Sequence, residues 1–394
     1  MISVDEALAR VLALAAPLPA EEIALSEAAG RVLAAPVVAR RDQPPFAASA
    51  MDGYAIGDTS AGPGARFRVI GEAGAGHGFP GPVGPGEAVR IFTGAPLPEG
   101  TNRVVIQEDT SRSEDIVTLG DSLDGGLNVR PAAADFSVGD RLDAPRRLRP
   151  ADLALIAAMN APRVTVSRRP VVALIATGDE LVMPGETPGP DQIIASNTFA
   201  LKAMAESVGA EARLLPIARD TEAELRLTLD LAADADLIVT IGGASVGDHD
   251  LVGKVAGDMG LDRAFYKVAM RPGKPLMAGT LHGTPMLGLP GNPVSSIVCG
   301  HLFMLPALRA MQGLTEVSPR PLPAILGADV GPTGPRKHYM RARLAPGETL
   351  PRITPFDSQD SALLTILTEA EALLIRPVGD GPRKAGETVH YLPL

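Results

Sequence analysis

The chain has 394 residues, of which 45% are hydrophobic and 21% are charged, and its formal net charge is -10. This composition is typical of a soluble globular protein, and the length predicts two to four structural units. The acidic balance and the 3% aromatic content argue against nucleic-acid binding through basic tracts and stacking side chains. A single cysteine, Cys299, excludes an intrachain disulfide and a cysteine-rich zinc site.

The N-terminus resembles the start of an amphipathic helix rather than a targeting segment. Residues 1–10 carry acidic side chains and lack the basic end and apolar block of a signal peptide. No stretch reaches ~18 uninterrupted apolar residues, so we expect no membrane span. We therefore expect a cytoplasmic protein with neither a nucleic-acid nor a membrane partner.

Short strands are predicted between residues 46 and 140, after Pro44 and Pro45 close the first segment. Apolar runs alternate there with turns rich in Gly and Pro, a pattern that indicates a β-rich domain. The predicted strands span 66–70, 88–92, 103–107 and 115–119. A helix is predicted from Pro150 to Met159, with proline in its first turn.

From residue 170 to about 317, strands and helices alternate. Strands are predicted at 171–176, 212–217 and 237–241, and helices at 198–208, 221–233 and 294–311. A further helix is predicted after the third strand and ends at Met259. This βαβαβ pattern predicts a parallel sheet with helices on both faces and a ligand at the carboxyl ends of the strands. Residues 318–394 return to short strands and predict a small barrel or sheet.

Five loops at this predicted sheet edge carry groups suited to a ligand. They span 177–180, 219–220, 242–250, 270–275 and 288–296. The glycine-rich loop at 242–250 lies between a strand and a helix, where a phosphate is readily bound. Four acids (Asp179, Glu180, Asp220, Asp250) and two cations (Arg271, Lys274) occur in these loops. Mg²⁺ between a phosphate and one or two carboxylates explains why acids accompany a phosphate loop.

Each of these signals also has a purely structural interpretation. Asp250 alone is more often a helix N-cap than a metal ligand. Gly242 and Gly243 alone indicate only a turn, and the Pro290-Gly-Asn-Pro293 segment is a good turn in any protein. The convergence of five such loops on one edge is what favours a ligand site.

Four motifs in these loops resemble one known family. Thr177-Gly-Asp-Glu-Leu181, Gly242-Gly-Ala-Ser-Val-Gly-Asp248, Arg271-Pro-Gly-Lys-Pro275 and Leu289-Pro-Gly-Asn-Pro-Val-Ser295 occur in the order found in the molybdopterin molybdenumtransferase family, which includes the C-terminal domain of gephyrin. Ser49-Ala-Met-Asp-Gly-Tyr-Ala55, Ile91-Phe-Thr-Gly-Ala-Pro-Leu-Pro98 and Gln107-Glu108 extend the resemblance, which covers most of the chain.

The resemblance implies a multidomain fold that combines α/β and β domains. Its parts are an extended linking domain (1–45 with 141–169), a β-rich front domain (46–140), a central α/β molybdopterin-binding domain with a mostly parallel sheet (170–317), and a small C-terminal β-barrel-like domain (318–394). It further implies an elongated homodimer in which the front domain of one subunit faces the α/β domain of the other. Transient contacts with molybdopterin adenylyltransferase and with acceptor molybdoenzymes are also implied.

The implied reaction takes adenylylated molybdopterin and molybdate, inserts the metal at the dithiolene, and releases AMP. Carried over by motif, the catalytic residues are Asp52, Thr93, Glu180, Asp220 and Asp250, of which Glu180 and Asp250 match Mg²⁺ ligands. The residues that match binding positions are Glu108, Asp135, Gly242, Gly243, Ser245, Gly247, Lys267, Arg271, Lys274, Pro290, Gly291, Asn292, Ser295, Arg341 and Ser361.

Two segments depart from the family pattern. Asn102-Arg103 replaces an acidic and apolar pair, and Asp360-Ser361 replaces a glycine-serine pair beside the implied molybdate site. Two other functions remain open: a scaffold that binds molybdopterin without turnover, and a molybdopterin adenylyltransferase or nucleotide pyrophosphohydrolase on the same α/β domain. Four carboxylates argue against a passive anion binder. The front and C-terminal domains argue against the second alternative.

Overall fold

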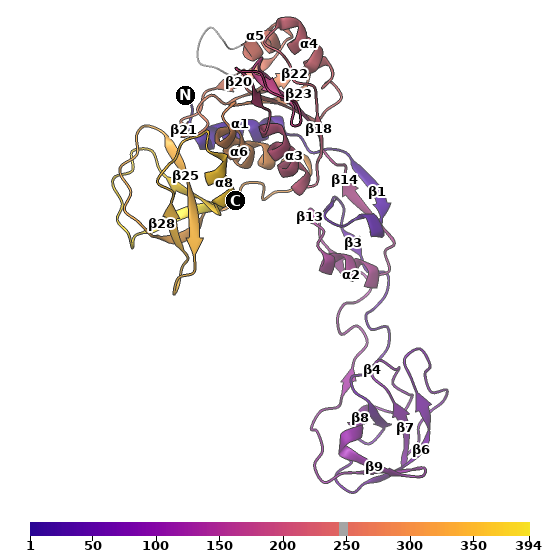
Figure 1. The fold of residues 1–394 in the computed structure, drawn as a ribbon. Coiled ribbons are helices and arrows are strands. Elements are labelled where there is room, and N and C mark those ends of the chain that lie inside the picture. Colours follow the sequence, from indigo (N-terminus) through magenta and orange to yellow (C-terminus); the bar gives the residue numbers. More distant parts are fainter. Residues whose placement is uncertain (244–250) are drawn as a thin grey trace.

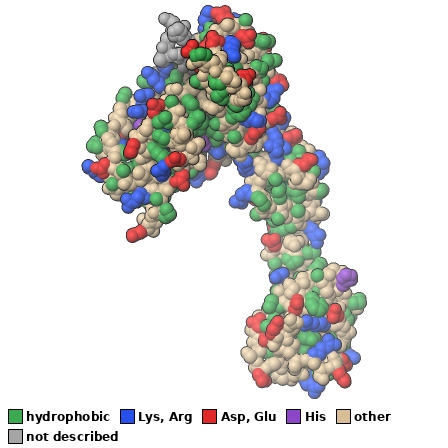
Figure 2. All heavy atoms as spheres, in the orientation of Figure 1, with side chains coloured by type: hydrophobic (Ala, Val, Ile, Leu, Met, Phe, Trp, Pro, Cys, Tyr) green, Lys and Arg blue, Asp and Glu red, His purple; other side chains and the backbone are tan. Residues whose placement is uncertain are grey.

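The protein is elongated, with its parts arranged along a bent path (Figure 1). A computed structural model describes residues 1–243 and 251–394. The α/β body and a C-terminal barrel lie together at one end, and a β lobe lies at the other. A slender linking region joins the two ends (Figure 2).

The α/β body is built on a six-stranded sheet. Its order is β18 (Glu211–Leu214), β15 (Val171–Ala176), β19 (Leu237–Ile241), β23 (Thr284–Leu289), β22 (Met277–Leu281), β20 (Asp262–Tyr266). The first four strands are parallel, and β22 runs antiparallel to both of its neighbours, β23 and β20. β15 and β19 are apolar and almost entirely buried, as expected of strands covered on both faces. The mostly parallel sheet predicted from the sequence is confirmed.

Helices cover both faces of this sheet. One apolar cluster packs α3 (Asn197–Ser207), α6 (Pro293–Cys299) and α7 (Leu305–Met311) against the sheet, and a second cluster packs α4 (Glu222–Asp230) and α5 (Leu251–Asp258) against the other face. The N-terminal helix α1 (Val4–Leu14) also belongs to the first cluster through Val4, Ala7 and Val11. This spacing places the three side chains on one face of the helix, so α1 packs on the α/β body.

α6 and α7 are joined by a π-helical segment, Gly300–Met304. The combined run Pro293–Met311 is the one helix among residues 1–243 and 251–394 that is long and apolar enough to cross a membrane. However, 78% of it is buried within the protein, which is the position of a core helix.

The linking region is a small sheet with one helix. The sheet order is β1 (Ala20–Ala24), β14 (Arg163–Ser167), β2 (Val32–Leu33), β13 (Arg146–Arg147), and α2 (Pro150–Ala158) packs beside it. Two chain passages therefore build this region together, while α1 lies on the α/β body instead. The predicted boundaries of the domains stay a prediction.

The front lobe is a six-stranded sheet. Its order is β8 (Arg103–Ile106), β5 (Gly53–Ile56), β7 (Glu87–Ile91), β6 (Arg66–Ala73), β10 (Ile116–Leu119), β9 (Thr110–Ser113). All four strands predicted there are present, and β5 and β9 are additional. A short pair, β4 (Ala48–Ser49) with β11 (Val129–Arg130), lies where the lobe joins the linking region.

The C-terminal region is a closed barrel of five strands. β25 (Lys337–Ala345), β26 (Arg352–Pro355), β24 (Leu322–Leu326), β28 (Thr388–Pro393) and β27 (Ala372–Arg376) pair in that order, and β27 pairs back with β25. β21 (Met270–Arg271) from the α/β body pairs in parallel with β25 and ties the barrel to that body. A short helix that the sequence did not suggest, α8 (Leu364–Glu369), contacts α6.

Candidate active site

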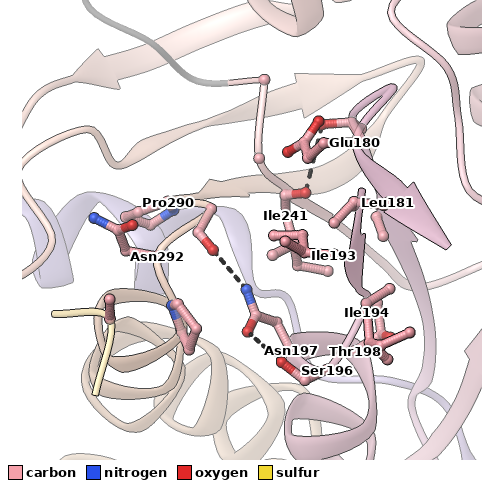
Figure 3. Close-up of a pocket in the computed structure, with 18 of the residues that line it drawn as sticks. Glu180, Leu181, Ile193, Ile194, Ser196, Asn197, Thr198, Ile241, Pro290 and Asn292 are labelled. Carbon is pink, nitrogen blue, oxygen red and sulfur yellow. Dashed lines mark hydrogen bonds between the residues drawn. The ribbon is translucent and has the colours of Figure 1, made fainter. Parts of the chain in front are cut away.

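A cavity of about 610 Å³ lies where β15, β19 and β23 end, and we call it the sheet-edge pocket (Figure 3). Each of these strands continues directly into the pocket wall, at Thr177, Gly242 and Pro290. Further parts of the wall come from the strand Ile193–Ile194, the start of α3, and Ala362 of the C-terminal region. The carboxyl edge of the sheet therefore holds a cavity, as the βαβ pattern predicted.

Two glycines in this wall leave no room for side chains. Gly242 has a φ of +97°, and a Cβ there would lie 2.6 Å from the carbonyl oxygen of Thr177. Gly243 has a φ of +63°, and its Cβ would lie 2.3 Å from Cγ2 of Val252. Only glycine adopts this backbone without strain, and the bare main chain can approach a ligand closely.

Glu180 and Lys274 both line the pocket and bring opposite charges to it. Neither side chain forms a hydrogen bond or ion pair with any residue in 1–243 or 251–394. The Glu180 carboxylate lies close to the Cα of Gly178, where a Cβ would be 2.3 Å from Oε2. Within the described parts of the chain, an acid and a cation therefore stay unpaired and are available to a ligand.

Arg219 holds the loop that carries Glu180. Its Nη1 donates hydrogen bonds to the carbonyl oxygens of Asp179 (3.0 Å) and Leu181 (2.9 Å), on either side of Glu180. A third contact reaches the carbonyl of Gly178 at 3.5 Å. We did not single out Arg219 from the sequence, although it lies beside Asp220 in one of the five loops.

Asp220 lies next to this loop but does not line the pocket. Its backbone N–H donates to Oδ1 of Asp179 at 3.0 Å, which ties the two loops together. Asp179 therefore has a structural partner. Three other predicted residues, Ser245, Gly247 and Asp250, lie outside the described residues.

Pro290, Gly291 and Asn292 form the wall at the start of α6. Asn197 Nδ2 donates to the carbonyl of Gly291 at 2.7 Å and fixes this turn to α3 (Figure 3). Asn292 Nδ2 donates to the hydroxyl of Ser361 at 3.0 Å, and the Val294 N–H donates to the Ser361 carbonyl at 3.1 Å. Ser361, which the resemblance implied as a binding residue, is thus held beside this turn.

Two further predicted contacts lie behind the wall. Ser295 is 4% exposed in the first turn of α6 and is not among the lining residues. Arg341 of β25 is 2% exposed, and its Nη1 donates to the carbonyl of Leu363 at 3.4 Å. Burial lowers the pKa of the Arg341 guanidinium, and the Asp360 carboxylate opposes this shift. Asp360, which departs from the family pattern, therefore compensates a buried cation.

Arg271 and Lys267 also lie outside the sheet-edge pocket. Arg271 lines a smaller cavity with Arg336 and His338, on the barrel side of the Pro272-Gly273 turn. Lys267 has a φ of +71°, and its Nζ lies 4.8 Å from the centroid of the Tyr266 ring. The structure therefore separates Arg271 from Lys274, although they are three residues apart.

A second group of predicted residues meets in the front lobe. The Thr93 N–H and hydroxyl both donate to Oδ1 of Asp52 at 2.8 Å, across 41 residues of sequence. The hydrogen bond from the Thr93 backbone lowers the pKa of Asp52 most, and the bond from the Thr93 hydroxyl lowers it further. The charge of Arg90 adds to the effect. Asp52 is therefore a carboxylate at neutral pH.

Arg90 organises the strand ends around this pair. It donates to the Gly53 carbonyl (3.1 Å) and to Oε1 of Gln107 (2.5 Å), and its guanidinium lies over the rings of Tyr54 and Phe92. Gln107 Nε2 in turn donates to Glu108 at 3.3 Å. We call Asp52, Arg90, Thr93, Gln107 and Glu108 the front cluster. Asp135 is exposed and pairs through its N–H with the Gln43 carbonyl at 2.9 Å, outside this cluster.

Arg103, in the other segment that departs from the family pattern, has a structural role. It is 8% exposed and donates to the carbonyls of Thr59 (3.3 Å), Ala61 (3.0 Å) and Asp124 (3.3 Å). A buried cation that satisfies three loop carbonyls stabilises the lobe without entering either site.

Family comparisons agree along almost the whole chain. Residues 2–160 match the MoeA N-terminal region (domains I and II), residues 173–310 match a probable molybdopterin binding domain, and residues 323–394 match the MoeA C-terminal region (domain IV). The three matches follow one another in the order that the sequence motifs suggested.

Two relatives of this chain carry the same name. The molybdopterin molybdenumtransferase of Nostoc sp. is 36% identical over 386 residues, which cover 95% of this chain and 88% of that protein. The Haemophilus influenzae protein of the same name is 35% identical over 79% of this chain and 78% of its own length. The molybdopterin biosynthesis MoeA protein of Pyrococcus horikoshii has the same fold, with a TM-score of 0.84, 27% identity and full coverage of both chains. The chain belongs to the molybdopterin molybdenumtransferase family.

Proposed function

We propose that this protein inserts molybdenum from molybdate into adenylylated molybdopterin and releases AMP. The observation that carries the proposal is the sheet-edge pocket, which combines a bare glycine backbone with one acid and one cation, neither of them paired within residues 1–243 and 251–394. Membership in the family supplies the substrate class. The proposed setting is a cytoplasmic homodimer that acts on small molecules.

The diphosphate of the substrate would lie against Gly242 and Gly243. Their backbone permits close approach, and Lys274 supplies a cation for phosphate oxygens. The Pro290-Gly-Asn292 turn forms the adjoining wall, with Gly291 beside Gly242, and is held by Asn197 and Ser361. In this arrangement a water oxygen forms a bond to phosphorus, the diphosphate P–O bond breaks, and AMP leaves.

The residues of the pocket fit a Mg²⁺ ion that is shared with the substrate. Residues 1–243 and 251–394 contain no group of three metal-ligating side chains, so the protein offers no complete cage there. Mg²⁺ bound to phosphates usually takes only one or two carboxylates. Glu180, together with Asp250 outside the described residues, would hold the ion. When bound, Mg²⁺ would neutralise charge on the diphosphate.

The front cluster requires a second subunit under this proposal. Figure 1 places the front lobe at the opposite end of the chain from the α/β body, with the linking region between them. A substrate in the pocket of one chain would meet Asp52 and Thr93 of its dimer partner. The front cluster would then orient the pterin or the attacking water. Contacts with a molybdopterin adenylyltransferase and with acceptor molybdoenzymes would be transient.

An insertion assay with adenylylated molybdopterin tests the proposal. We expect AMP release and formation of the molybdenum cofactor, with Glu180→Ala lowering AMP release roughly 10²–10³-fold. Glu186→Ala is a matched control, because Glu186 is an exposed acid outside the pocket. Binding without turnover would indicate a scaffold, and ATP-dependent adenylylation without molybdate would indicate an adenylyltransferase. Either result would overturn the proposal.

A further inference from the structure

Two chain crossings join the linking region to the α/β body, and they lie side by side. Residues 15–19 connect α1 to β1, and residues 168–170 connect β14 to β15. The Arg168 N–H donates to the Pro19 carbonyl at 2.9 Å, so the two crossings are hydrogen-bonded to each other. Arg168 also donates two hydrogen bonds to the Asp236 carboxylate, at 2.6 and 2.9 Å. Two adjacent crossings form a hinge about which the linking region can rotate as a unit.

A third contact joins the same two parts away from these crossings. Arg147 Nη2, in β13, donates to the Ser207 carbonyl, at the end of α3, at 2.8 Å. Within residues 1–243 and 251–394, it is the one hydrogen bond between the linking region and the α/β body outside the two crossings. β13 lies two strands from β14 in its sheet, which is roughly 10 Å at the usual strand spacing. A bond at that distance from the hinge opposes a rotation that the crossings alone permit.

The end of α3 is well suited to accept this bond. The last carbonyls of a helix have no N–H partner within the helix, and the helix dipole favours a cation beside them. Gln312 Nε2 donates to the Val208 carbonyl at 3.0 Å. Arg169 Nη1 donates to the Gly209 carbonyl at 3.2 Å. Arg147 therefore completes a set of three donors, and it is the donor that comes from the far edge of the linking sheet.

The backbone turn at Gly30 packs against the same end of α3. A Cβ at Gly209, which has a φ of +90°, would lie 3.6 Å from the Gly30 carbonyl oxygen. A Cβ at Gly30 would lie 4.0 Å from Arg147 Nη2. The nearby charge is positive, because burial and then the charge of Arg147 lower the pKa of the Arg309 guanidinium. Hydrogen bonding to the helix end, rather than an ion pair, therefore holds Arg147 in place.

α3 connects this contact to the sheet-edge pocket. Asn197 and Thr198, at its start, line the pocket, and its 11 residues span roughly 16 Å. Leu201 and Ala205 fix the helix in the first apolar cluster of the α/β body. The linking region is thus held to a helix that also forms the pocket wall (Figure 1). The front lobe lies at the far end of the linking region, so a small rotation at the hinge moves the front cluster further than it moves β13.

We propose that Arg147 is a positioning residue, which holds the linking region against the end of α3 and so sets where the front lobe is presented. Without this bond the linking region rotates about the two crossings. The effect on turnover rests on the proposed function, in which the front cluster meets the pocket of a partner subunit. Rotation leaves the pocket itself unchanged, so turnover and AMP affinity respond differently.

Single-molecule FRET on the full-length protein measures the distance between the front lobe and the α/β body. Dyes are placed at Ser113→Cys in β9 and Ala223→Cys in α4, both exposed, while the native Cys299 is buried. Labelled chains are diluted into unlabelled chains, so that a dimer carries one dye pair.

We expect Arg147→Ala to raise the population outside the wild-type distance peak roughly three- to tenfold. Arg147→Lys keeps a cationic donor and should give an intermediate value. Arg141→Ala is the matched control, because Arg141 is an exposed arginine of the linking region whose partner is Asp143 of the same region, at 3.9 Å. Its distance distribution should match that of the wild type.

Kinetics of AMP release give the second measurement. In Arg147→Ala, kcat should fall roughly three- to tenfold, while AMP affinity by calorimetry stays within about twofold of the wild type. Equal losses of kcat and AMP affinity would indicate general damage to the fold and contradict a positioning role. An unchanged distance distribution, or a broadened one with unchanged kcat, would also overturn the proposal. If the wild type releases no AMP, the proposed function fails, and the FRET comparison still decides whether Arg147 holds the hinge.

Discussion

The sheet-edge pocket and the front cluster are built in different ways. The pocket is an open cavity, and loops after three parallel strands converge on it because those strands end at one edge. The front cluster is exposed and depends on one carboxylate that accepts two hydrogen bonds from Thr93. The pocket can bind a ligand within one chain, whereas the front cluster presents organised groups to something outside its own lobe. Two sites of this kind suit a cleft that is completed by dimerisation.

The strongest expected effect on AMP binding is at Gly243. Gly243→Ala introduces a Cβ 2.3 Å from Cγ2 of Val252 at a φ of +63°, so the backbone at this position or the Val252 side chain must shift. We expect AMP affinity, measured by calorimetry, to fall roughly hundredfold, or about 2.7 kcal/mol. Gly257→Ala is the control, because a Cβ at that position in α5 meets nothing within 4 Å. Equal AMP affinity in both variants would remove Gly243 from the site.

Arg103 tests whether the front lobe depends on its unusual buried cation. Arg103→Leu leaves the carbonyls of Thr59, Ala61 and Asp124 without their donor. We expect the free energy of unfolding of the front lobe, measured in urea, to fall by about 1–3 kcal/mol. AMP binding at the sheet-edge pocket should not change. The exposed neighbour gives the comparison: Asn102→Ala should stay within about 0.5 kcal/mol of wild type.

Arg219 tests how far the pocket depends on the support of its loop. Arg219→Ala removes the donor to the carbonyls on either side of Glu180, so the carboxylate loses its fixed position. We expect kcat/KM for AMP release to fall about tenfold, or about 1.4 kcal/mol. Arg226→Ala, which removes an exposed arginine from α4, should have little effect. An unchanged rate in Arg219→Ala would show that the loop needs no such support.

The smallest expected effect concerns the hydroxyl of Thr93. The bonds from Thr93 lower the pKa of Asp52, so the carboxylate stays ionised to a lower pH than a free aspartate. Thr93→Val removes the hydroxyl bond and keeps the backbone bond, which raises the pKa of Asp52 toward its usual value. The acidic limb of the pH–rate profile should move to higher pH, and activity at neutral pH should fall about two- to tenfold.

Thr93→Ser keeps the hydroxyl and should retain the wild-type pH profile. If the acidic limb of the pH–rate profile is identical in the wild type, Thr93→Val and Thr93→Ser, Asp52 is not the group that titrates there.

Local sequence predicted the pocket better than it predicted the surroundings of the pocket. The loops after β15, β19 and β23 could be located because each follows a buried apolar strand. The divergence of Arg271 and Lys274 depends on the turn at Gly273 and on the pairing of β21 with a strand more than 60 residues away. A motif shows that both cations are close in sequence but not which cavity each one lines.

Long-range packing explains the other differences. The hydrogen bonds between Asp52 and Thr93 follow from the position of both residues at the ends of neighbouring strands. The resemblance implied that both residues belong to the active site, but neither it nor periodicity predicted that they contact each other. α1 packs on the α/β body through its apolar face, although its chain leads directly into the linking region. Amphipathicity predicted the helix, but it does not specify the partner surface.

Mixing two inactive variants tests most directly whether one cleft uses two chains. Glu180→Ala chains keep the front cluster, and Asp52→Ala chains keep the pocket. If these chains are unfolded and refolded together, random pairing makes half of the dimers mixed, each with one intact cleft of two. We expect about a quarter of wild-type AMP release from the mixture and almost none from either variant alone. Activity that stays at the level of the single variants, in a mixture shown to contain mixed dimers, would contradict a cleft shared between subunits.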